Sequence, residues 1–329
     1  MRALVVRLDN LGDVLLAGPA VRAVAARADE VVMLCGPRGR AAADLLPGVD
    51  RVVEWCAPWI DPEPGPVERA EAERLVDLVR GADRALIFTS FHQSPLPLAL
   101  LLRLAGVPWI GGISDDYPGS LLDLRHRCDA DVPEPERMLA LAADAGFPTP
   151  HDTRLRVRGP LPDVTALTGA TGYVVVHPGT SVPARAWPPE RCAEAVRALT
   201  AAGHRVVVTG DRREKELTAH VAGIDGVDLG GRTTLPELAA ALAGAAAVVA
   251  GNTGPAHLAA AVGAPVVSLF APTVPAARWA PYGVRTVLLG DQNAPCKDSR
   301  ARVCPVPGHP CLSSVTADRV AAAVEEVIA

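Results

Sequence analysis

The sequence predicts two α/β domains in tandem, each with a parallel sheet covered by helices on both faces. Short runs rich in Val, Ile and Leu alternate with helical patterns rich in Ala, Leu and Arg along the chain, which is the rhythm of βαβ units. The apolar runs are continuous, as in strands buried on both faces. The length of 329 residues suits two domains of about 150 residues each.

The first half contains this alternation from its first residues. Strands are expected at residues 2–8, 30–35, 51–55 and 84–90, with helices from about Val14, from about Gly39 and over 67–80. Residues 95–106 form an apolar helix candidate that either packs in the core or contacts a membrane surface. A stretch rich in Pro, Thr and Gly near residues 150–170 is typical of a connector.

The alternation restarts after the connector. Strands are expected at residues 172–180, 204–210, 227–231, 246–252 and 264–270, with helices from about Pro188, Asp211, Thr234 and Pro255. We therefore expect an N-terminal domain over residues 1–160 and a C-terminal domain over 161–329, with the last helix free to pack back on the N-terminal domain. In such a pair, ligands bind at the carboxyl ends of the strands, in the cleft between the domains.

Charge and hydropathy exclude several classes of protein. The net charge is −5 and no segment is dense in Lys and Arg, which argues against nucleic acid as the partner. Arg7 and Asp9 interrupt the N-terminal apolar run, and no apolar run reaches the roughly 18 residues of a membrane-spanning helix. We therefore expect a cytoplasmic protein. No G-x-G-x-x-G follows the first strand, which disfavours a nicotinamide dehydrogenase.

Three of the seven cysteines lie in one proline-rich loop near the C-terminus. Together with a histidine they form the pattern C-x7-C-x4-H-x-C, made by Cys296, Cys304, His309 and Cys311. Their residue types suit a structural metal or a disulfide, although the spacing differs from a tight C-x2-C knuckle. The alternative is a plain reduced loop, and no cofactor is expected.

Two turns in the C-terminal half carry groups that suit an anionic ligand. The first holds His177, Gly179, Thr180 and Ser181 after a strand, followed by Arg185 before the next helix. Backbone amides, hydroxyls and a guanidinium of this kind can hold a diphosphate. The alternative is an ordinary solvated turn, since these residue types are common in turns.

The second of these turns, "GNTGPAH", has the pattern of an anion site at a helix N-terminus. A strand runs into Asn252, Thr253 and Gly254, proline follows in the first helical turn, and His257 lies one turn further on. Unpaired amides and a hydroxyl at this position suit a phosphate. His257 either contacts that phosphate or is a satisfied structural residue.

The turn "TGDRREKEL" places two glutamates near another helix N-terminus. Thr209 and Gly210 end the strand, and Glu214 and Glu216 follow in the first turns of the helix. Acidic residues at this position usually complement the helix dipole. The alternative is a carboxylate that binds ribose hydroxyls.

The stretch "VVRLDNLGDVLLAGPAV" places Asp9 and Asp13 in the first turn after the first strand. Carboxylates there complement the helix dipole but repel a bound phosphate. If the C-terminal half takes the anion, Asp13 can act as a base on an acceptor hydroxyl. The alternative for Asp13 is a dipole complement, and Asp9 is interpreted as a solvated turn residue.

These motifs, in this order, resemble glycosyltransferase family 9, the ADP-heptose:lipopolysaccharide heptosyltransferases and their relatives. The likeness runs through "VVRLDNLGDVLLAGPAVRAV", "VVVHPGTSVPARAWPPERCAEAV", "VVVTGDRREKEL", "DLGGRTTLPELAAALAG" and "GNTGPAHLAAAVGAPVVSLFAP". The resemblance implies a GT-B fold, that is, two Rossmann-like doubly wound domains facing a central cleft. It also implies that the C-terminal domain binds a nucleotide-sugar donor and the N-terminal domain binds the acceptor.

The resemblance also implies roles for individual residues. Asp13 matches the catalytic base, the "TGPAH" segment matches the binding site of the donor diphosphate, and Arg185 matches a basic residue that supports the leaving group. Glu216 is the best match for a ribose-binding acid, with Glu214 close behind. Two positions depart from the family pattern, which often has Lys at Arg185 and usually has Asp at Asn252.

The expected activity is inverting, metal-independent transfer of a sugar to a hydroxyl of a glycan or small-molecule acceptor. The resemblance implies a heptose, with ADP-heptose favoured as donor. The alternatives are a nucleotide-sugar epimerase or hydrolase, or a nucleotide-sugar-binding protein of the same fold with weakened catalysis. No residue pattern identifies the acceptor or the oligomeric state.

Overall fold

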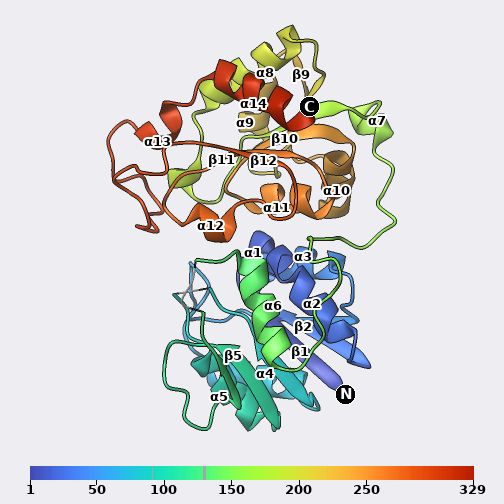
Figure 1. Ribbon diagram of the computed structural model, residues 1–329, viewed down its shortest axis with the longest axis vertical. Helices are drawn as coiled ribbons and strands as arrows, with labels where there is room; N and C mark the ends of the chain where they lie inside the picture. The colour runs from blue at the N-terminus through green and yellow to red at the C-terminus, as the bar shows by residue number, and fades with distance from the viewer. Residues whose placement is uncertain (91, 129–130) are drawn as a thin grey trace. The chain divides into compact units, whose positions relative to one another are not determined.

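The computed structural model describes residues 1–90, 92–128 and 131–329 (Figure 1). The chain divides into two compact units, Met1–Arg158 and Gly159–Ala329. Each unit contains one six-stranded sheet, and every strand pairing within it is parallel. The expected α/β class with parallel sheets is confirmed.

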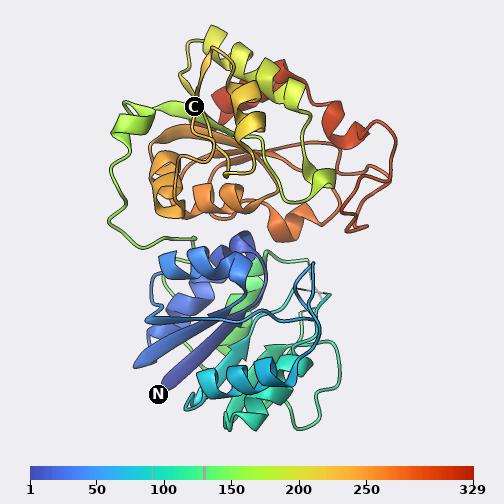
Figure 2. The ribbon, with the colours of Figure 1, turned by 180° about the vertical axis from the view of Figure 1, so that it is seen from behind.

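Unit 1 has the strand order β3-β2-β1-β4-β5-β6. Its strands are β1 (Arg2–Arg7), β2 (Glu30–Cys35), β3 (Arg51–Glu54), β4 (Arg84–Ile87), β5 (Trp109–Ile113) and β6 (Leu124–His126). Its helices are α1 (Leu11–Leu16), α2 (Gly18–Ala25), α3 (Arg40–Leu45), α4 (Arg69–Val79), α5 (Leu96–Leu104) and α6 (Glu134–Asp144), with a short 3-10 turn, η1 (Pro37–Gly39). Figure 2 shows from behind the face that α4 and α5 cover.

Unit 2 has the strand order β12-β11-β10-β7-β8-β9. Its strands are β7 (Tyr173–His177), β8 (Val206–Val208), β9 (Gly226–Asp228), β10 (Ala245–Gly251), β11 (Val266–Leu269) and β12 (Thr286–Leu289). Its helices are α7 (Thr165–Thr168), α8 (Pro189–Ala201), α9 (Lys215–Ala222), α10 (Leu235–Ala243), α11 (Gly254–Ala261), α12 (Ala276–Trp279), α13 (Pro310–Ser313) and α14 (Ala317–Ile328), with a 3-10 turn, η2 (Pro183–Arg185). In Figure 1, α8, α9 and α14 lie on one face of the sheet and α10 and α11 on the other.

The two sheets have the same topology when the strands are counted from the start of each unit. In both, the strand order reverses between two central strands, β1 and β4 in unit 1 and β7 and β10 in unit 2. The turns that follow these strands therefore meet at the carboxyl edge of each sheet, which is where open α/β sheets bind ligands.

The strands form where the apolar runs predicted them. Leu4, Val5 and Val6 are fully buried, and β1 pairs with β2 on one side and β4 on the other. A strand between two partners and beneath helices on both faces needs apolar residues at every position, which explains the continuous runs. Three strands were not predicted, namely β5, β6 and β12.

The apolar helix α5 and the last helix, α14, each pack within their own unit. In α5, Leu98 and Leu102 are buried while Leu100 and Leu104 are exposed, so the helix has one core face. The buried residues of α14, among them Val320, belong to the core of unit 2. Among the helices that the structure describes, none is both long and apolar enough to cross a membrane.

Candidate active site

A completely buried arginine organises the carboxyl edge of the unit 1 sheet. Arg7, the last residue of β1, places its Nε 2.9 Å from Asp9 and its Nη2 3.0 Å from Asp13. The same Nη2 donates to the Ser90 hydroxyl at 2.8 Å, and Nη1 lies 3.5 Å from the buried Glu134. One guanidinium thus binds three carboxylates, using the fixed fork of donors that distinguishes Arg from Lys.

This cluster corrects the interpretation of Asp9 as a solvated turn residue. The Asp9 side chain is only 10% exposed, and its Oδ1 accepts a hydrogen bond of 2.5 Å from Gln93 Nε2. Burial raises the pKa of Asp9, while Arg7 opposes that rise. Burial alone lowers the pKa of Arg7, but the three carboxylates outweigh it and the net shift is upward.

Asp13 is the most accessible of these three carboxylates. It lies in the first turn of α1, and its side chain is 19% exposed. The helix dipole favours a carboxylate at this position, and the ion pair with Arg7 tethers it from inside the unit. The structure therefore presents a fixed carboxylate that solvent or a substrate can reach.

In unit 2, the turns after β7 and β8 are neighbours at the carboxyl edge of the sheet. His177 is buried, and its Nδ1 lies 2.9 Å from the hydroxyl of the fully buried Thr209. Burial lowers the pKa of His177 to about 4, so the imidazole is neutral near pH 7. Thr209 thus holds the ring of His177 in place.

Glu214, rather than Glu216, reaches the glycines of these turns. A Cβ on Gly179 would collide with the Glu214 carboxylate, and one on Gly210 would lie 3.1 Å from it. Glu214 also accepts a hydrogen bond of 2.8 Å from the amide of Asp211, and burial raises its pKa. Glu216 is exposed in the first turn of α9.

The turn after β10 leads directly into α11. Thr253 is the N-terminal cap of this helix, yet its side chain makes no capping hydrogen bond, and proline occupies the first turn. Asn252 is 3% exposed, and its Nδ2 has no hydrogen-bond partner among the described residues. His257 is buried in the first turn of the helix after Gly254. These features match an anion site at a helix N-terminus.

The cysteine-rich loop after Cys296 makes hydrogen bonds to the turn that carries Arg185. The amide of Ala184 donates to the carbonyl of Arg302 at 2.9 Å, and His309 Nε2 lies 3.1 Å from the carbonyl of Ala184. Trp187 donates from Nε1 to the carbonyl of Leu312 at 3.1 Å. Both polar atoms of the Ala184 backbone are therefore bound by this loop, next to Arg185.

His309 reaches Ala184 from a strained backbone. Among the described residues, the non-glycine positions with positive φ are Asp298, Arg300 and His309, all in the loop after Cys296. Such positions cost free energy and persist where the surrounding structure fixes them. The sequence offered no signal for this contact, because His309 and Ala184 lie 125 residues apart.

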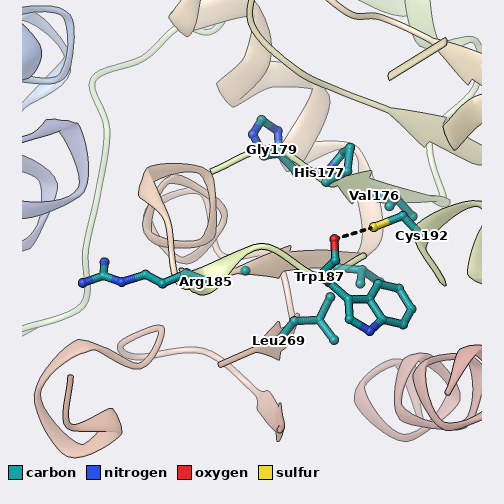
Figure 3. Close-up of a pocket in the computed structure, with 10 residues that line it drawn as sticks. Val176, His177, Gly179, Arg185, Trp187, Cys192 and Leu269 are labelled. Carbon is teal, nitrogen blue, oxygen red and sulfur yellow. Dashed lines mark hydrogen bonds between the residues drawn. The ribbon is translucent and has the colours of Figure 1, made fainter. Parts of the chain in front are cut away.

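A pocket lies at the carboxyl edge of the unit 2 sheet, between the turn after β7, the 3-10 turn η2 and the end of β10 (Figure 3). Its lining includes His177, Gly179, Arg185 and Gly251. Figure 3 shows the Arg185 side chain extending away from Trp187 and Cys192. Two other predicted residues of the same turn, Thr180 and Ser181, are more exposed than Gly179.

The metal alternative for the C-terminal loop is not supported. Within residues 1–90, 92–128 and 131–329, no group of three or more His, Cys, Asp or Glu side chains is placed to hold a metal ion. All seven cysteines are free thiols. Burial raises the pKa of Cys311 to about 11, and a hydrogen bond with Cys296 adds to the rise. The Cys311 thiol therefore stays protonated near pH 7.

Two solved heptosyltransferase structures have the same fold. Escherichia coli ADP-heptose lps heptosyltransferase II aligns with a TM-score of 0.76 at 20% identity, over 100% of this chain and 98% of that one. The structure of "E. coli heptosyltransferase WaaC with ADP-2-deoxy-2-fluoro heptose" aligns with a TM-score of 0.73 at 22% identity, over 99% of both chains. The two doubly wound units thus have the GT-B fold.

Sequence comparison identifies the family. Residues 89–309 match the family model "Glycosyltransferase family 9 (heptosyltransferase)". Lipopolysaccharide heptosyltransferase 1 of Pseudomonas aeruginosa is 29% identical over 318 residues, covering 92% of this chain and 87% of that protein. The chain belongs to glycosyltransferase family 9.

Proposed function

We propose that the protein transfers a heptose from ADP-heptose to a hydroxyl of an acceptor glycan or small molecule, with inversion at the anomeric carbon. The observation that carries the proposal is Asp13, a partly exposed carboxylate fixed by the buried Arg7. Family membership supports the class of reaction, and the heptosyltransferase relatives support the sugar. The names of those relatives point to a lipopolysaccharide as one such acceptor.

In the proposed reaction, the oxygen of the acceptor hydroxyl attacks the anomeric carbon while Asp13 accepts the proton of that hydroxyl. The bond from that carbon to the diphosphate breaks as the new glycosidic bond forms. The transition state resembles an oxocarbenium ion, so negative charge grows on the leaving diphosphate. No metal ion is required in this scheme, because fixed donors of unit 2 stabilise that charge.

Those donors are the groups at the carboxyl edge of the unit 2 sheet. The free amides in the first turn of α11 and the hydroxyl of Thr253 can bind the diphosphate, as helix N-termini bind anions. Arg185 supplies a full positive charge. Neutral His177 and Gly179 line the same pocket as Arg185. Glu214, which lies against Gly179, is better placed than Glu216 to bind ribose hydroxyls.

The test is Asp13→Asn, which keeps the size of the side chain and removes its basicity. Transfer should fall by about 10²–10⁴, whereas ADP should still raise the melting temperature, because the nucleotide binds unit 2. Asp44→Asn, at an exposed carboxylate of α3, is the control. Wild-type transfer by Asp13→Asn would refute the proposed base, and sugar released from donor without acceptor would indicate a hydrolase.

A further inference from the structure

Asp9 is a carboxylate of the unit 1 cluster that the proposed reaction does not use. It follows the end of β1 by two residues, and its side chain is 10% exposed. Gln93, from the loop after β4, donates to Asp9 Oδ1 at 2.5 Å. Removing a carboxylate from water costs free energy even when it is paired and hydrogen-bonded, so a gain elsewhere must offset the burial of Asp9.

Asp9 acts on Arg7 mainly through its charge. Asp9 Oδ2 lies 2.9 Å from Arg7 Nε, yet neither atom has an aligned hydrogen-bond partner among the described residues. The short hydrogen bonds of Arg7 go from Nη2 to Asp13 Oδ1 at 3.0 Å and to the Ser90 hydroxyl at 2.8 Å. An amide at position 9 could still accept the hydrogen bond from Gln93. Only the negative charge therefore requires a carboxylate at this position.

Asp9 and Asp13 share the positive charge of Arg7. A carboxylate that has an arginine to itself binds a proton weakly, and a weak base is a poor general base. A second carboxylate on the same arginine reduces this effect, because like charges close together favour protonation. The charge of Asp9 therefore helps Asp13 to remain an effective base.

The charged groups that face Asp9 in the described part of the chain come from three elements. Arg7 lies on β1, Asp13 on α1 and Glu134 on α6. Glu134 is completely buried and lies 3.5 Å from Arg7 and 3.7 Å from Arg137. Because Glu134 is farther from Arg7 than Asp9 is, and also faces Arg137, Asp9 is the stronger competitor of Asp13 for Arg7.

We propose that Asp9 is a positioning residue of the transfer reaction, whose negative charge shares Arg7 with Asp13 and so sets how readily Asp13 accepts the proton of the acceptor hydroxyl. The inference rests on the proposed function, because it concerns the same base. Gln93 supports this role, since a hydrogen bond donated to a carboxylate favours its ionised form.

The test is the pH dependence of kcat in Asp9→Asn, with ADP-heptose as donor and heptose-free lipopolysaccharide as acceptor. The variant keeps the shape of the side chain and removes its charge. At pH 8, kcat should be about tenfold below that of the wild type, since Arg7 then acts on Asp13 undivided. Burial raises the pKa of Asp9, so wild-type Asp9 itself becomes neutral in mild acid. The two kcat values should therefore converge as the pH falls toward about 5.

Two further variants check the assignment. Asp83→Asn is the matched control, because Asp83 accepts a hydrogen bond from the amide of Arg2 at the opposite end of β1, and its kcat should equal that of the wild type at every pH. Gln93→Met removes the donor to Asp9, so its kcat should approach that of Asp9→Asn at a higher pH than the wild type does. If kcat of Asp9→Asn equals that of the wild type, or is lower by one constant factor at every pH, the inference is overturned.

A double-mutant cycle tests the sharing of Arg7 without an assay of transfer. Urea midpoints are measured at pH 8 for the wild type, Asp9→Asn, Asp13→Asn and the double variant. Asp13→Asn should lower the midpoint more in the Asp9→Asn background, because Asp13 has Arg7 to itself there. Equal losses in the two backgrounds would overturn the inference, whether or not the chain transfers heptose.

The outcome is separable from that of the proposed transfer. Wild-type transfer by Asp13→Asn contradicts the proposed base, whatever the cycle gives. Transfer that requires Asp13 but keeps one ratio of kcat between wild type and Asp9→Asn at every pH contradicts the positioning role only. If the chain transfers no heptose and the cycle shows coupling, Arg7 is shared and the failure lies with the proposed function.

Discussion

Arg7 and Asp13 form an ion pair of 3.0 Å in which the arginine is completely buried and the carboxylate is 19% exposed. The pair connects the inside of the unit 1 sheet with its carboxyl edge. A carboxylate held in this way keeps one position without losing access to solvent. The two residues therefore serve both the stability of unit 1 and the proposed chemistry.

Replacing Arg7 should destabilise the fold strongly. Arg7→Met leaves Asp9, Asp13 and Glu134 without their shared cation, and breaking a buried charge cluster on one side typically costs about 3–5 kcal/mol. Urea unfolding measures this loss. Arg40→Met, which removes an exposed ion pair with Asp44, should cost less than about 1 kcal/mol. Equal losses in the two variants would contradict the assigned role of Arg7.

Replacing Arg185 should slow transfer with little effect on folding. Arg185→Ala removes the cation that we propose stabilises the leaving diphosphate, and loss of one such group typically lowers kcat by about 10²–10³. Arg185→Lys keeps the charge without the planar fork, so its kcat should lie between the kcat of the wild type and that of Arg185→Ala. Steady-state kinetics with ADP-heptose test this. Arg191→Ala, at a surface pair with Glu194, provides the baseline, and a similar kcat in both alanine variants would refute the prediction.

The contact between His309 and Ala184 should matter for rate through Arg185. His309→Ala removes the hydrogen bond to the carbonyl of Ala184 and frees the turn to move. Small misplacement of a catalytic group costs up to about 10²-fold, so kcat should fall about tenfold or more. His309→Gln can restore a donor and should recover part of the rate. A change in melting temperature without a change in kcat would mean that the contact is purely structural.

His177 should make unit 2 sensitive to acid. Its pKa is 6.5 in the unfolded chain and about 4 when buried, so between these values the unfolded chain binds a proton that the folded one does not. The stability contributed by the neutral imidazole is complete above pH 6.5 and is lost as the pH falls toward 4, by about 3 kcal/mol in all.

The variant His177→Gln, which does not titrate, isolates this effect. Urea unfolding at a series of pH values should give wild-type stability that falls more steeply than the variant's between pH 6.5 and 4. Parallel curves would show that His177 is not held neutral by burial.

Much of the fold could be predicted from the sequence because its pattern is local. Continuous apolar runs mark strands such as β1 and β10, and the polar turns after them follow directly in the chain. β5 escaped prediction because Gly111 and Gly112 occupy its centre, and glycine weakens a strand signal. β12 is a short run, Thr286–Leu289, in which Leu288 is exposed.

The connections within the site could not be predicted in the same way. Asp13 and Thr253 stand out because each follows a strand and begins a helix. Arg7 binds Ser90 and Glu134, which lie 83 and 127 residues further along the chain, so only the folded topology brings them together. One local signal was present, since a charged residue at the end of a fully apolar strand must find opposite charges when it is buried.

The repeated strand order of the two units has a consequence for how the protein can be altered. The same frame ends in clustered carboxylates around Arg7 in unit 1 and in the N-terminus of α11 and Arg185 in unit 2, so a few edge residues can give the two units different ligand preferences. With the donor on unit 2 and the acceptor on unit 1, as we propose, donor and acceptor selectivity can diverge independently. A hybrid that replaces residues 159–329 with those of another family member should exchange the nucleotide sugar and retain the acceptor.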